Sequence, residues 1–280
     1  MHRLSLVAAL SIVTGLASAR GAHADTIDSV RIYALDCGAM EIQDMAGFSD
    51  TGEYDKKAGK LVDACYLIRH PKGDLLWDLG LGDELAKAGG MTNELGHFHV
   101  DHTLVDQLKQ LELQPSDIEY IAFSHFHFDH TGNANLFAKA TWIVSRRELA
   151  WASATPTPFG VMPATWSALK SAKQQIADYD TDVFGDGSVR VMRAPGHTPG
   201  HQVLVVTLKQ AGTVVLSGDL YHTRDNAKLG RVPVFNDSRA DTLASFDRVA
   251  KLIARTRARL YVQHAPEDFA AFPRFPQYLR

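Results

Sequence analysis

The sequence lacks the features that mark membrane-spanning, nucleic-acid-binding or disordered proteins. None of its apolar runs reaches the roughly 18 residues that a membrane-spanning helix needs, and no repeat or low-complexity tract interrupts its 280 residues. The formal net charge is −3, so there is no basic excess to attract nucleic acid. Hydrophobic residues make up 45% of the chain and charged residues 22%, which are ordinary globular values. We therefore expect a soluble globular protein that has neither a nucleic acid nor a membrane as its partner.

Cysteine is scarce, which argues against a thiolate metal site. Only Cys37 and Cys65 are present, and neither lies in a metal-binding spacing. In an oxidising compartment the two thiols can pair, and an unstrained disulfide would contribute about 3 kcal/mol. The alternative is two small buried residues on early strands. The sequence does not place the two Cα atoms within bonding range, so both interpretations stay open.

The first 24 residues are interpreted as an export signal. Arg3 gives a positive start, the stretch 4–17 is apolar, and Ala22-His23-Ala24 matches a cleavage pattern ahead of Asp25. A retained amphipathic helix is the alternative. We predict a cleaved signal peptide over residues 1–24, a periplasmic or secreted protein, and a single α/β domain over residues 25–280.

Strand and helix patterns alternate along the rest of the chain. Alternating apolar residues and short apolar runs between turn residues predict strands. Apolar residues at helical spacing predict helices. The predicted strands cover residues 30–34, 61–68, 75–77, 118–123, 214–216 and 260–262, and helices are predicted from about residue 103 and around 243–253. Strands and helices mixed in this way indicate sheets covered by helices.

The most informative motif directly follows the strand predicted at 118–123. Residues 124–133 read Ser-His-Phe-His-Phe-Asp-His-Thr-Gly-Asn. Loops at the carboxyl ends of strands are where α/β sheets place their sites. His125 and His127 can both reach one metal ion, while Asp129 and His130 turn toward a second. Imidazole and carboxylate without thiolate suit zinc, and they tolerate manganese, iron or cobalt.

Three further candidate ligands follow later in the chain. His197 lies in a tight Pro/Gly loop, and His264 follows the strand predicted at 260–262. Asp219 lies at the end of the strand predicted at 214–216, and its two carboxylate oxygens can bridge two ions. Any one of these residues alone would more often be a surface or core residue, but together at strand ends they predict a two-metal centre.

A second copy of the spacing lies upstream, at His97-Phe98-His99-Val100-Asp101-His102. It follows a polar, glycine-containing stretch and leads into the helix that begins near Thr103. A loop entering a helix does not hold histidines on a rigid edge as a strand end does. We therefore expect this copy not to hold the catalytic metals. Asp101 is interpreted as the cap of the helix, and His97 and Phe98 as rim residues of the pocket.

The motif resembles the metallo-β-lactamase superfamily, and the ordered set of residues resembles the N-acyl-homoserine lactonases within it. The resemblance extends through nearly all of residues 25–280. It includes the segments 64–68 and 77–80, the repeated Pro-Gly-His at 195–201, and an ending like that at 275–278. It implies a four-layer αββα sandwich with two Zn²⁺ per chain at one edge. The resemblance assigns His125, His127 and His197 to the first ion, Asp129, His130 and His264 to the second, and Asp219 to the bridge.

The same resemblance implies a reaction, the opening of the lactone ring of N-acyl-homoserine lactones. Two divalent ions lower the pKa of bound water toward about 7, and Asp129 can transfer the proton. Asp78 is interpreted as an acid that orients a ligand histidine, or equally as a turn cap. His201 is interpreted as structural, because the ligand set is complete without it.

One position departs from the family pattern. The lactonases resembled here usually have a tyrosine three residues after the bridging aspartate, whereas this chain has His222 there, with Tyr221 beside it. Either residue can donate a hydrogen bond to an oxyanion, and either can instead pack the loop. The role is therefore assigned to this pair without a choice between them.

Other functions remain as alternatives. An exported hydrolase of other esters or phosphotriesters fits the same residues. A β-lactamase is disfavoured by the bridging Asp219, glyoxalase II by the few residues after His264, and a zinc-stabilised binding module by the same bridging acid. The expected partner is a small lactone or ester, and the oligomeric state is left open between monomer and homodimer. The candidates for an acyl-chain channel, each of which can equally be core, are Phe98, Phe126, Phe128, Met162, Trp166 and Phe235.

Overall fold

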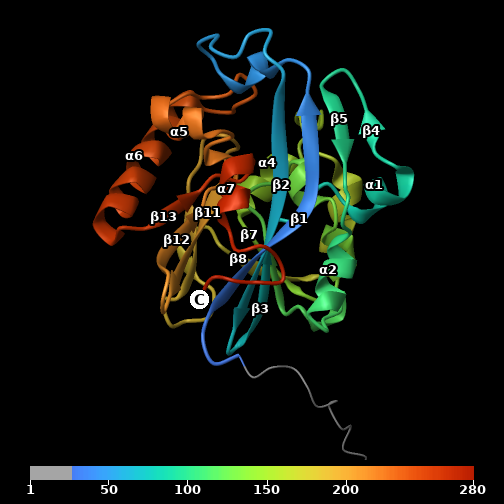
Figure 1. The fold of residues 1–280 in the computed structure, drawn as a ribbon, viewed down its shortest axis with the longest axis vertical. Helices are drawn as coiled ribbons and strands as arrows, with labels where there is room; N and C mark the ends of the chain where they lie inside the picture. The colour runs from blue at the N-terminus through green and yellow to red at the C-terminus, as the bar shows by residue number, and fades with distance from the viewer. Residues whose placement is uncertain (1–26) are drawn as a thin grey trace, which may run out of the picture.

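Two β-sheets pack face to face, and helices cover both outer surfaces (Figure 1). The computed structural model describes residues 27–280, so the predicted signal peptide at 1–24 lies outside the described residues. The larger sheet contains β1 (Arg31–Ile42), β2 (Gly59–His70), β3 (Gly73–Trp77), β4 (Met91–Thr92), β5 (Gly96–His99), β6 (Tyr120–Ala122), β7 (Thr141–Val144) and β8 (Lys173–Ile176). The smaller sheet contains β9 (Thr181–Asp182), β10 (Val189–Arg193), β11 (Gln202–Leu208), β12 (Gly212–Leu216) and β13 (Arg259–Tyr261).

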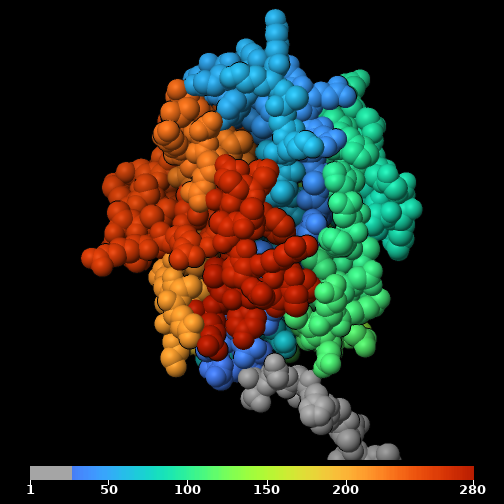
Figure 2. Space-filling model, viewed as in Figure 1, coloured from blue at the N-terminus to red at the C-terminus, as the bar shows by residue number. Residues whose placement is uncertain are grey.

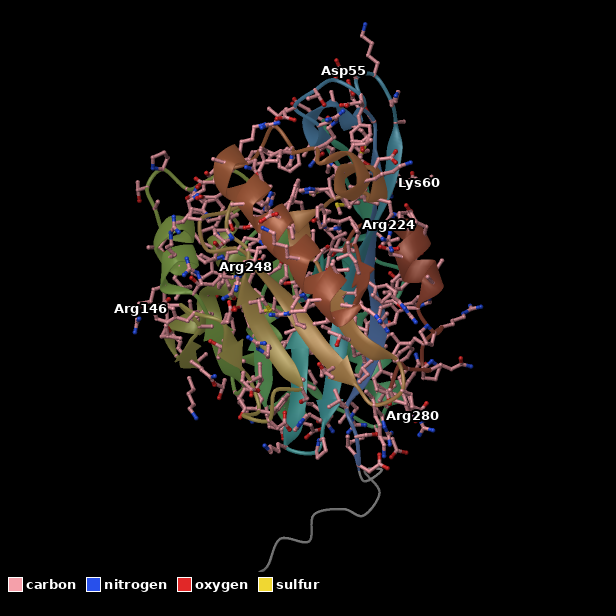
Figure 3. All side chains as sticks on the ribbon, turned by 90° about the vertical axis from the view of Figure 1, so that its left-hand side faces the viewer. Asp55, Lys60, Arg146, Arg224, Arg248 and Arg280 are labelled. Atoms are coloured by element: carbon pink, nitrogen blue, oxygen red, sulfur yellow. A yellow bond between two sulfur atoms is a disulfide. The ribbon has the colours of Figure 1, made fainter. Side chains whose placement is uncertain are left out.

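Seven α-helices connect and cover the strands of the described residues. They are α1 (Asp83–Ala88), α2 (Leu104–Gln110), α3 (Phe128–Thr131), α4 (Arg146–Ala152), α5 (Arg224–Leu229), α6 (Arg239–Thr256) and α7 (Pro266–Ala271). In Figure 3, α6 crosses the outer face of the smaller sheet, and the labelled Arg248 on this helix pairs with Asp180. No helix among residues 27–280 is long and apolar enough to cross a membrane.

Period-two alternation in the strands produces three apolar layers. Tyr66 and Trp77 of the larger sheet meet Leu204 and Leu216 of the smaller sheet in the central layer. Cys65, on the opposite face of β2, packs with the helical cover of the larger sheet. The two outer layers are completed by Leu104 and Leu108 of α2 on one side and by Phe246, Val249 and Leu252 of α6 on the other. This arrangement confirms the four-layer αββα sandwich that the resemblance implied.

The strand order brings several loops to one edge. β3, β6 and β7 run parallel in the larger sheet, and β12 and β13 run parallel in the smaller sheet. Parallel strands end on the same side of a sheet, so the segments that follow β3, β6, β12 and β13 can meet. The observed strand β6 is shorter than the predicted 118–123, and a 3₁₀ turn at residues 115–117 precedes it.

The C-terminal segment closes the front of the sandwich. Figure 2 shows it in red, spread between the elements of the two sheets. Leu279 pairs with Ile32 of β1, and the ring of Phe272 packs against Tyr66 of one sheet and Tyr261 of the other. The chain end therefore fastens the two sheets together.

Cys37 of β1 and Cys65 of β2 form a disulfide, with their Cα atoms 5.7 Å apart. The bond lies where β1 changes register against β2, between Asp36 and Ala39. Of the two interpretations that the sequence left open, the structure selects the disulfide.

The upstream histidine motif differs from expectation in two ways. His97 and His99 lie on a strand, β5, which pairs with β1, and not in a loop. Asp101 does not cap α2, so that prediction was wrong. Thr103 is the N-cap residue, and Asp83 accepts hydrogen bonds from two further N–H groups of the helix, at 2.8 and 3.1 Å.

Candidate metal centre

Seven residues from five segments meet at the edge where the parallel strands end. In the larger sheet, the loop after β6 carries His125 and His127, and α3 continues it with Asp129 and His130. In the smaller sheet, the candidates follow three different strands. They are His197 after β10, Asp219 after β12 and His264 after β13. All the candidate ligands expected from the sequence are brought together, in two neighbouring groups.

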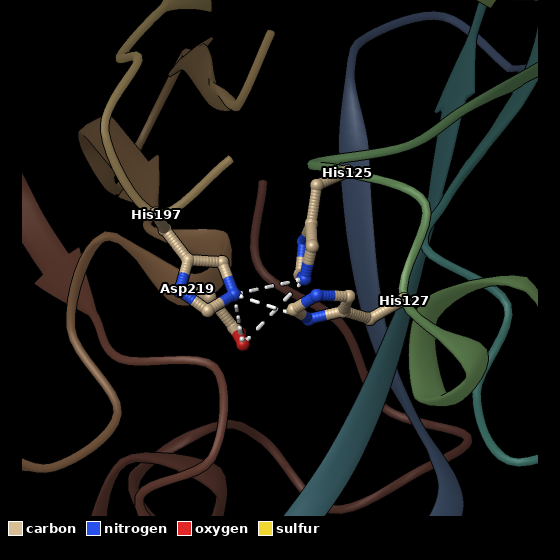
Figure 4. Close-up of side chains that lie close together, drawn as sticks. All are labelled: His125, His127, His197 and Asp219. Carbon is tan, nitrogen blue, oxygen red and sulfur yellow. Dashed lines mark hydrogen bonds and ion pairs between the residues drawn. The ribbon is translucent and has the colours of Figure 1, made fainter. Parts of the chain in front are cut away.

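The first group surrounds the nitrogen Nε2 of His197 (Figure 4). This atom lies 3.2 Å from Nε2 of His125 and 3.2 Å from Nδ1 of His127. Oδ2 of Asp219 lies 3.4 Å from the same nitrogen and 3.7 Å from Nε2 of His125. Three imidazoles and one carboxylate oxygen therefore converge on one point.

The second group uses the other oxygen of the same carboxylate. Oδ1 of Asp219 lies 3.2 Å from Nε2 of His130 and 2.9 Å from Nε2 of His264. Oδ2 of Asp129 lies 3.8 Å from each of these nitrogens. Because its two oxygens face the two groups separately, Asp219 has the geometry of a bridging ligand.

The donor atoms of this cluster fit divalent cations. Ring nitrogens that face one another at 3.2 Å need a proton or a cation between them, because two lone pairs cannot form a hydrogen bond. Among the described residues, Nε2 of His130 and Oδ1 of Asp219 are buried and face only each other and other candidate ligands. Burial lowers the pKa of His125 and His197 well below the usual range, and that of His127 to about 4. Such imidazoles are neutral at pH 7, which is the form that binds metal.

The second group is more highly charged. Burial opposes protonation of His130, but Asp219, Asp78 and Asp129 outweigh it and hold the pKa well above the usual value. Burial also opposes protonation of His264, but the nearby carboxylates, Asp219 above all, outweigh it and raise the pKa to about 9. Burial would raise the pKa of Asp219, yet the surrounding imidazoles keep it well below the usual range. The centre therefore favours positive charge, whether proton or metal ion.

Groups behind the candidate ligands orient them. Oδ2 of Asp78 lies 3.1 Å from Nδ1 of His130, and its Oδ1 accepts a hydrogen bond from the N–H of Ser124 at 2.6 Å. The carbonyl of Val62 lies 2.8 Å from Nδ1 of His264. In both histidines the nitrogen Nε2 is thereby left facing the cluster. Of the two roles considered for Asp78, its position fits the orienting one.

His201 lies behind the cluster and does not join it. Its Nδ1 lies 3.0 Å from the carbonyl of Ala194, and its Nε2 accepts the backbone N–H of Asp219 at 3.0 Å. The residue holds the bridging aspartate by its main chain, which agrees with the structural role predicted for it.

The structure separates the two residues at the position that departs from the family pattern. Nε2 of His222 lies 3.0 Å from Oδ2 of Asp219, whereas the ring of Tyr221 stacks on Phe246 in the layer under α6. The backbone at Tyr221 is extended, so consecutive side chains point to opposite sides. Of the two residues, His222 is therefore the one that reaches the cluster, and Tyr221 packs away from it.

Two buried acids near the site were missed from the sequence. Asp63 of β2 is 1% exposed, and both of its oxygens lack a hydrogen-bond partner within residues 27–280. Burial, and then the neighbouring Asp129, raise the pKa of its carboxyl well above the usual value. An acidic residue inside the apolar run 61–68 was a signal in the sequence that could have identified Asp63. Glu148 was also missed, and it gave no signal, because a charged residue on a short helix usually faces solvent.

Aromatic residues form one wall beside the metal-binding cluster. Phe235 contacts the rings of His222, His197 and Phe48, at centroid distances of 5.4, 6.1 and 5.1 Å. Phe159, which is 66% exposed, lies 5.9 Å from Phe235. Among the channel candidates, Phe98 and Phe126 are instead core residues.

The fold and the site together define a class of protein, an αββα sandwich with a candidate two-metal centre at its edge. Residues 59–264 match the family model of the metallo-beta-lactamase superfamily. The chain therefore belongs to the metallo-beta-lactamase superfamily, as the motif predicted, and is a metal-dependent hydrolase of that superfamily.

Several proteins to which the chain is similar are N-acyl homoserine lactonases. The chain is 33% identical over 234 residues to the N-acyl homoserine lactonase AttM of Azorhizobium caulinodans, covering 76% of this chain and 85% of that protein. It is 27% identical to an N-acyl homoserine lactonase of a Bacillus species, covering 79% and 89%. The solved structure of an N-acyl homoserine lactone hydrolase, with N-hexanoyl-L-homoserine bound at its catalytic metal centre, superposes with a TM-score of 0.77. The two sequences are 26% identical, and the superposition covers 89% of this chain and 98% of that one.

Proposed function

We propose that this enzyme opens the lactone ring of N-acyl-homoserine lactones at a centre of two metal ions. The observation that carries the proposal is the position of Asp219, whose two oxygens face two separate groups of ligands. A bridging carboxylate between histidine-rich sites suits two divalent ions and hydrolysis. The similarity to lactonases over three quarters of the chain supports the choice of substrate.

Zinc is the metal that the donor set favours. The seven candidate residues supply five imidazoles and two carboxylates, and the described residues place no thiolate among them. His125, His127 and His197 would hold one ion, and Asp129, His130 and His264 the other, with Asp219 between them. Other divalent first-row metals remain compatible with these ligands. The ions, when bound, would polarise the ester carbonyl and activate water at neutral pH.

The chain's own residues would then control the proton and the oxyanion. Asp129 reaches the cluster with one oxygen and is partly open to solvent, at 12% side-chain exposure, so it can take a proton from the attacking water and pass it to the leaving oxygen. His222 stands on the other side of Asp219, with both ring nitrogens buried and its Nε2 3.0 Å from Oδ2 of that carboxylate. An imidazole in that position can donate an N–H to the carbonyl oxygen as negative charge develops on it.

The aromatic wall suits an acyl chain. Phe48, Phe159 and Phe235 stand beside the histidines, and they leave apolar surface next to an otherwise charged centre. An acyl chain that lies on this surface would place the attached lactone over the metals. Apolar contact would also favour longer chains, because each buried CH₂ contributes about 0.8 kcal/mol.

Export is part of the proposal. The predicted signal peptide would take the enzyme to the periplasm or the medium, where disulfides persist. The bond between Cys37 and Cys65 is consistent with such a compartment.

A side-by-side hydrolysis assay tests the function. Acyl-homoserine lactones of several chain lengths, a cephalosporin, a phosphotriester and a simple aryl ester would be offered to the same preparation. We expect the lactones to be opened far faster than the cephalosporin is cleaved, and the open N-acyl-homoserine to be the product. Faster turnover of the cephalosporin would assign a β-lactamase instead, and faster turnover of the phosphotriester or aryl ester would assign the broader hydrolase.

A further inference from the structure

A buried carboxylate outside the metal-binding cluster joins two of the loops that form it. Glu148 lies on α4 and is 2% exposed. Its Oε1 accepts the backbone N–H of Phe126 at 3.0 Å. Its Oε2 accepts the hydroxyl of Thr198 and the N–H of Gly200, each at 2.8 Å. One side chain thus spans the loop after β6 and the loop after β10.

These two loops carry the three histidines of the first group. The backbone N–H bound at one end belongs to the residue between His125 and His127, and the hydroxyl bound at the other end belongs to the residue after His197. The imidazole nitrogens of the two loops already meet at 3.2 Å. Metal–ligand distances tolerate deviations of only about 0.2 Å, so a small change in loop separation would misplace the ligands.

Packing fixes the position of Glu148 itself. A Cβ atom at Gly200 would collide with the backbone nitrogen of Glu148, so the helix rests directly on the loop. Trp151, on the same helix, has its ring 5.7 Å from that of His127. α4 therefore acts as a rigid support for both loops.

The environment of Glu148 is not that of a stabilising ion pair. Burial raises the pKa of its carboxyl to about 7, although the hydrogen bonds from Thr198, Phe126 and Gly200 act to lower it. No cation within residues 27–280 forms a salt bridge with it, since Arg146 of the same helix pairs with Asp178. A buried acid without a cation is costly to fold, which favours a role in geometry.

We propose that Glu148 is a positioning residue of the metal centre. It fixes the separation between His197 and the pair His125 and His127, and so determines how tightly the first ion is held. The inference rests on the proposed two-metal function. Side chains that orient metal ligands from behind typically change metal affinity by about 10- to 100-fold when they are replaced.

The second ion should depend on Glu148 much less. Asp78 orients His130, and the carbonyl of Val62 orients His264. Neither contact involves α4. The loss of Glu148 should therefore weaken the binding of the first ion and leave the binding of the second ion nearly unchanged.

The test compares metal affinity in three proteins, the wild type, Glu148→Gln and Asp83→Asn. Glutamine keeps the volume of the side chain. Its NH₂ group, however, would face an N–H or O–H donor from which the carboxylate accepts a hydrogen bond. Asp83 is the matched control, because it is buried and accepts two backbone N–H groups at the start of α2. Zinc bound per chain is measured against buffered free zinc, well below the unfolding temperature. We expect one of the two binding midpoints of Glu148→Gln to move to about 10- to 100-fold higher free zinc, while both midpoints of Asp83→Asn stay unchanged.

Four results would overturn the proposal. Wild-type affinity at both positions in Glu148→Gln would show that the carboxylate does not position the ligands. An equal weakening in Asp83→Asn would show a general effect of stability. A wild type that binds fewer than two ions would refute the proposed function first, and the inference with it. If Glu148→Gln does not fold, Thr198→Val removes one of the three hydrogen bonds with little change of shape, and it should weaken the same ion by a smaller factor; an unchanged affinity there would count against the proposal.

Discussion

Replacement of His222 by alanine should slow lactone opening while both metal ions stay bound. The imidazole is 2% exposed, and its ring is held between Phe48 and Phe235, each with a centroid 5.4 Å away. A donor fixed in this way does not have to reorganise when charge develops on the substrate oxygen. Removal of one such donor typically costs about 2–4 kcal/mol of transition-state stabilisation. That corresponds to a fall in kcat of roughly 30- to 1000-fold.

The assay measures kcat and KM for one acyl-homoserine lactone, together with zinc per chain. Because the contact strengthens in the transition state, kcat should fall and KM should change little. His222→Gln, which keeps an N–H donor, should recover part of the rate. Tyr221→Phe is the matched control and should behave as the wild type, since its ring packs under α6. A normal kcat in His222→Ala with two ions bound would refute the assignment.

Three further predictions concern the supports of the site and the fold. Asp78→Asn should weaken the binding of one ion by about 10- to 100-fold in a chelator competition, because the neutral amide is a weaker hydrogen-bond acceptor for Nδ1 of His130, 3.1 Å away. The disulfide between Cys37 and Cys65 joins residues that are 28 positions apart in the sequence. Its reduction should lower the free energy of unfolding, measured in urea, by about 3–4 kcal/mol. Carboxyl NMR should show one glutamate titrating at about pH 7, absent in Glu148→Gln. Its pKa is raised in the fold, so its stabilising effect is complete below about pH 4.5 and is lost as the pH rises through about 7.

The sequence predicted the site better than the boundaries of the elements. Most of the candidate ligands could be predicted because they follow a run of strand-forming residues, and strand ends meet at one edge. The runs at 214–216 and 260–262 both correspond to observed strands, β12 and β13. Asp219 and His264, which end or follow these runs, accordingly lie together.

The upstream motif shows what local pattern cannot supply. We expected His97 and His99 in a loop, because glycine and polar residues precede them. Tertiary pairing with β1 instead holds them in a strand. They still lie outside both groups of candidate ligands in the described residues. The helix cap was misassigned for a related reason, because Asp83, distant in sequence, supplies the acceptor in place of Asp101.

Long-range contacts also explain the missed residues. Glu148 bonds to positions 22 and 50 residues away in the sequence, and no local pattern encodes such a link. Tyr221 and His222 are neighbours in sequence, and only the extended backbone decides which of them faces the candidate ligands. The disulfide, too, could be chosen only once β1 and β2 were paired.

The bridging carboxylate is the central feature of the account, and Asp219→Ala tests it most directly. Metal content and lactone turnover are measured on the purified variant and on the wild type. Without the shared carboxylate, two cations at close range lose the charge that screens them. The variant should therefore hold fewer than two ions per chain and show no lactone hydrolysis, whereas the wild type holds two and is active. An Asp219→Ala protein that keeps two ions and full activity would contradict the account.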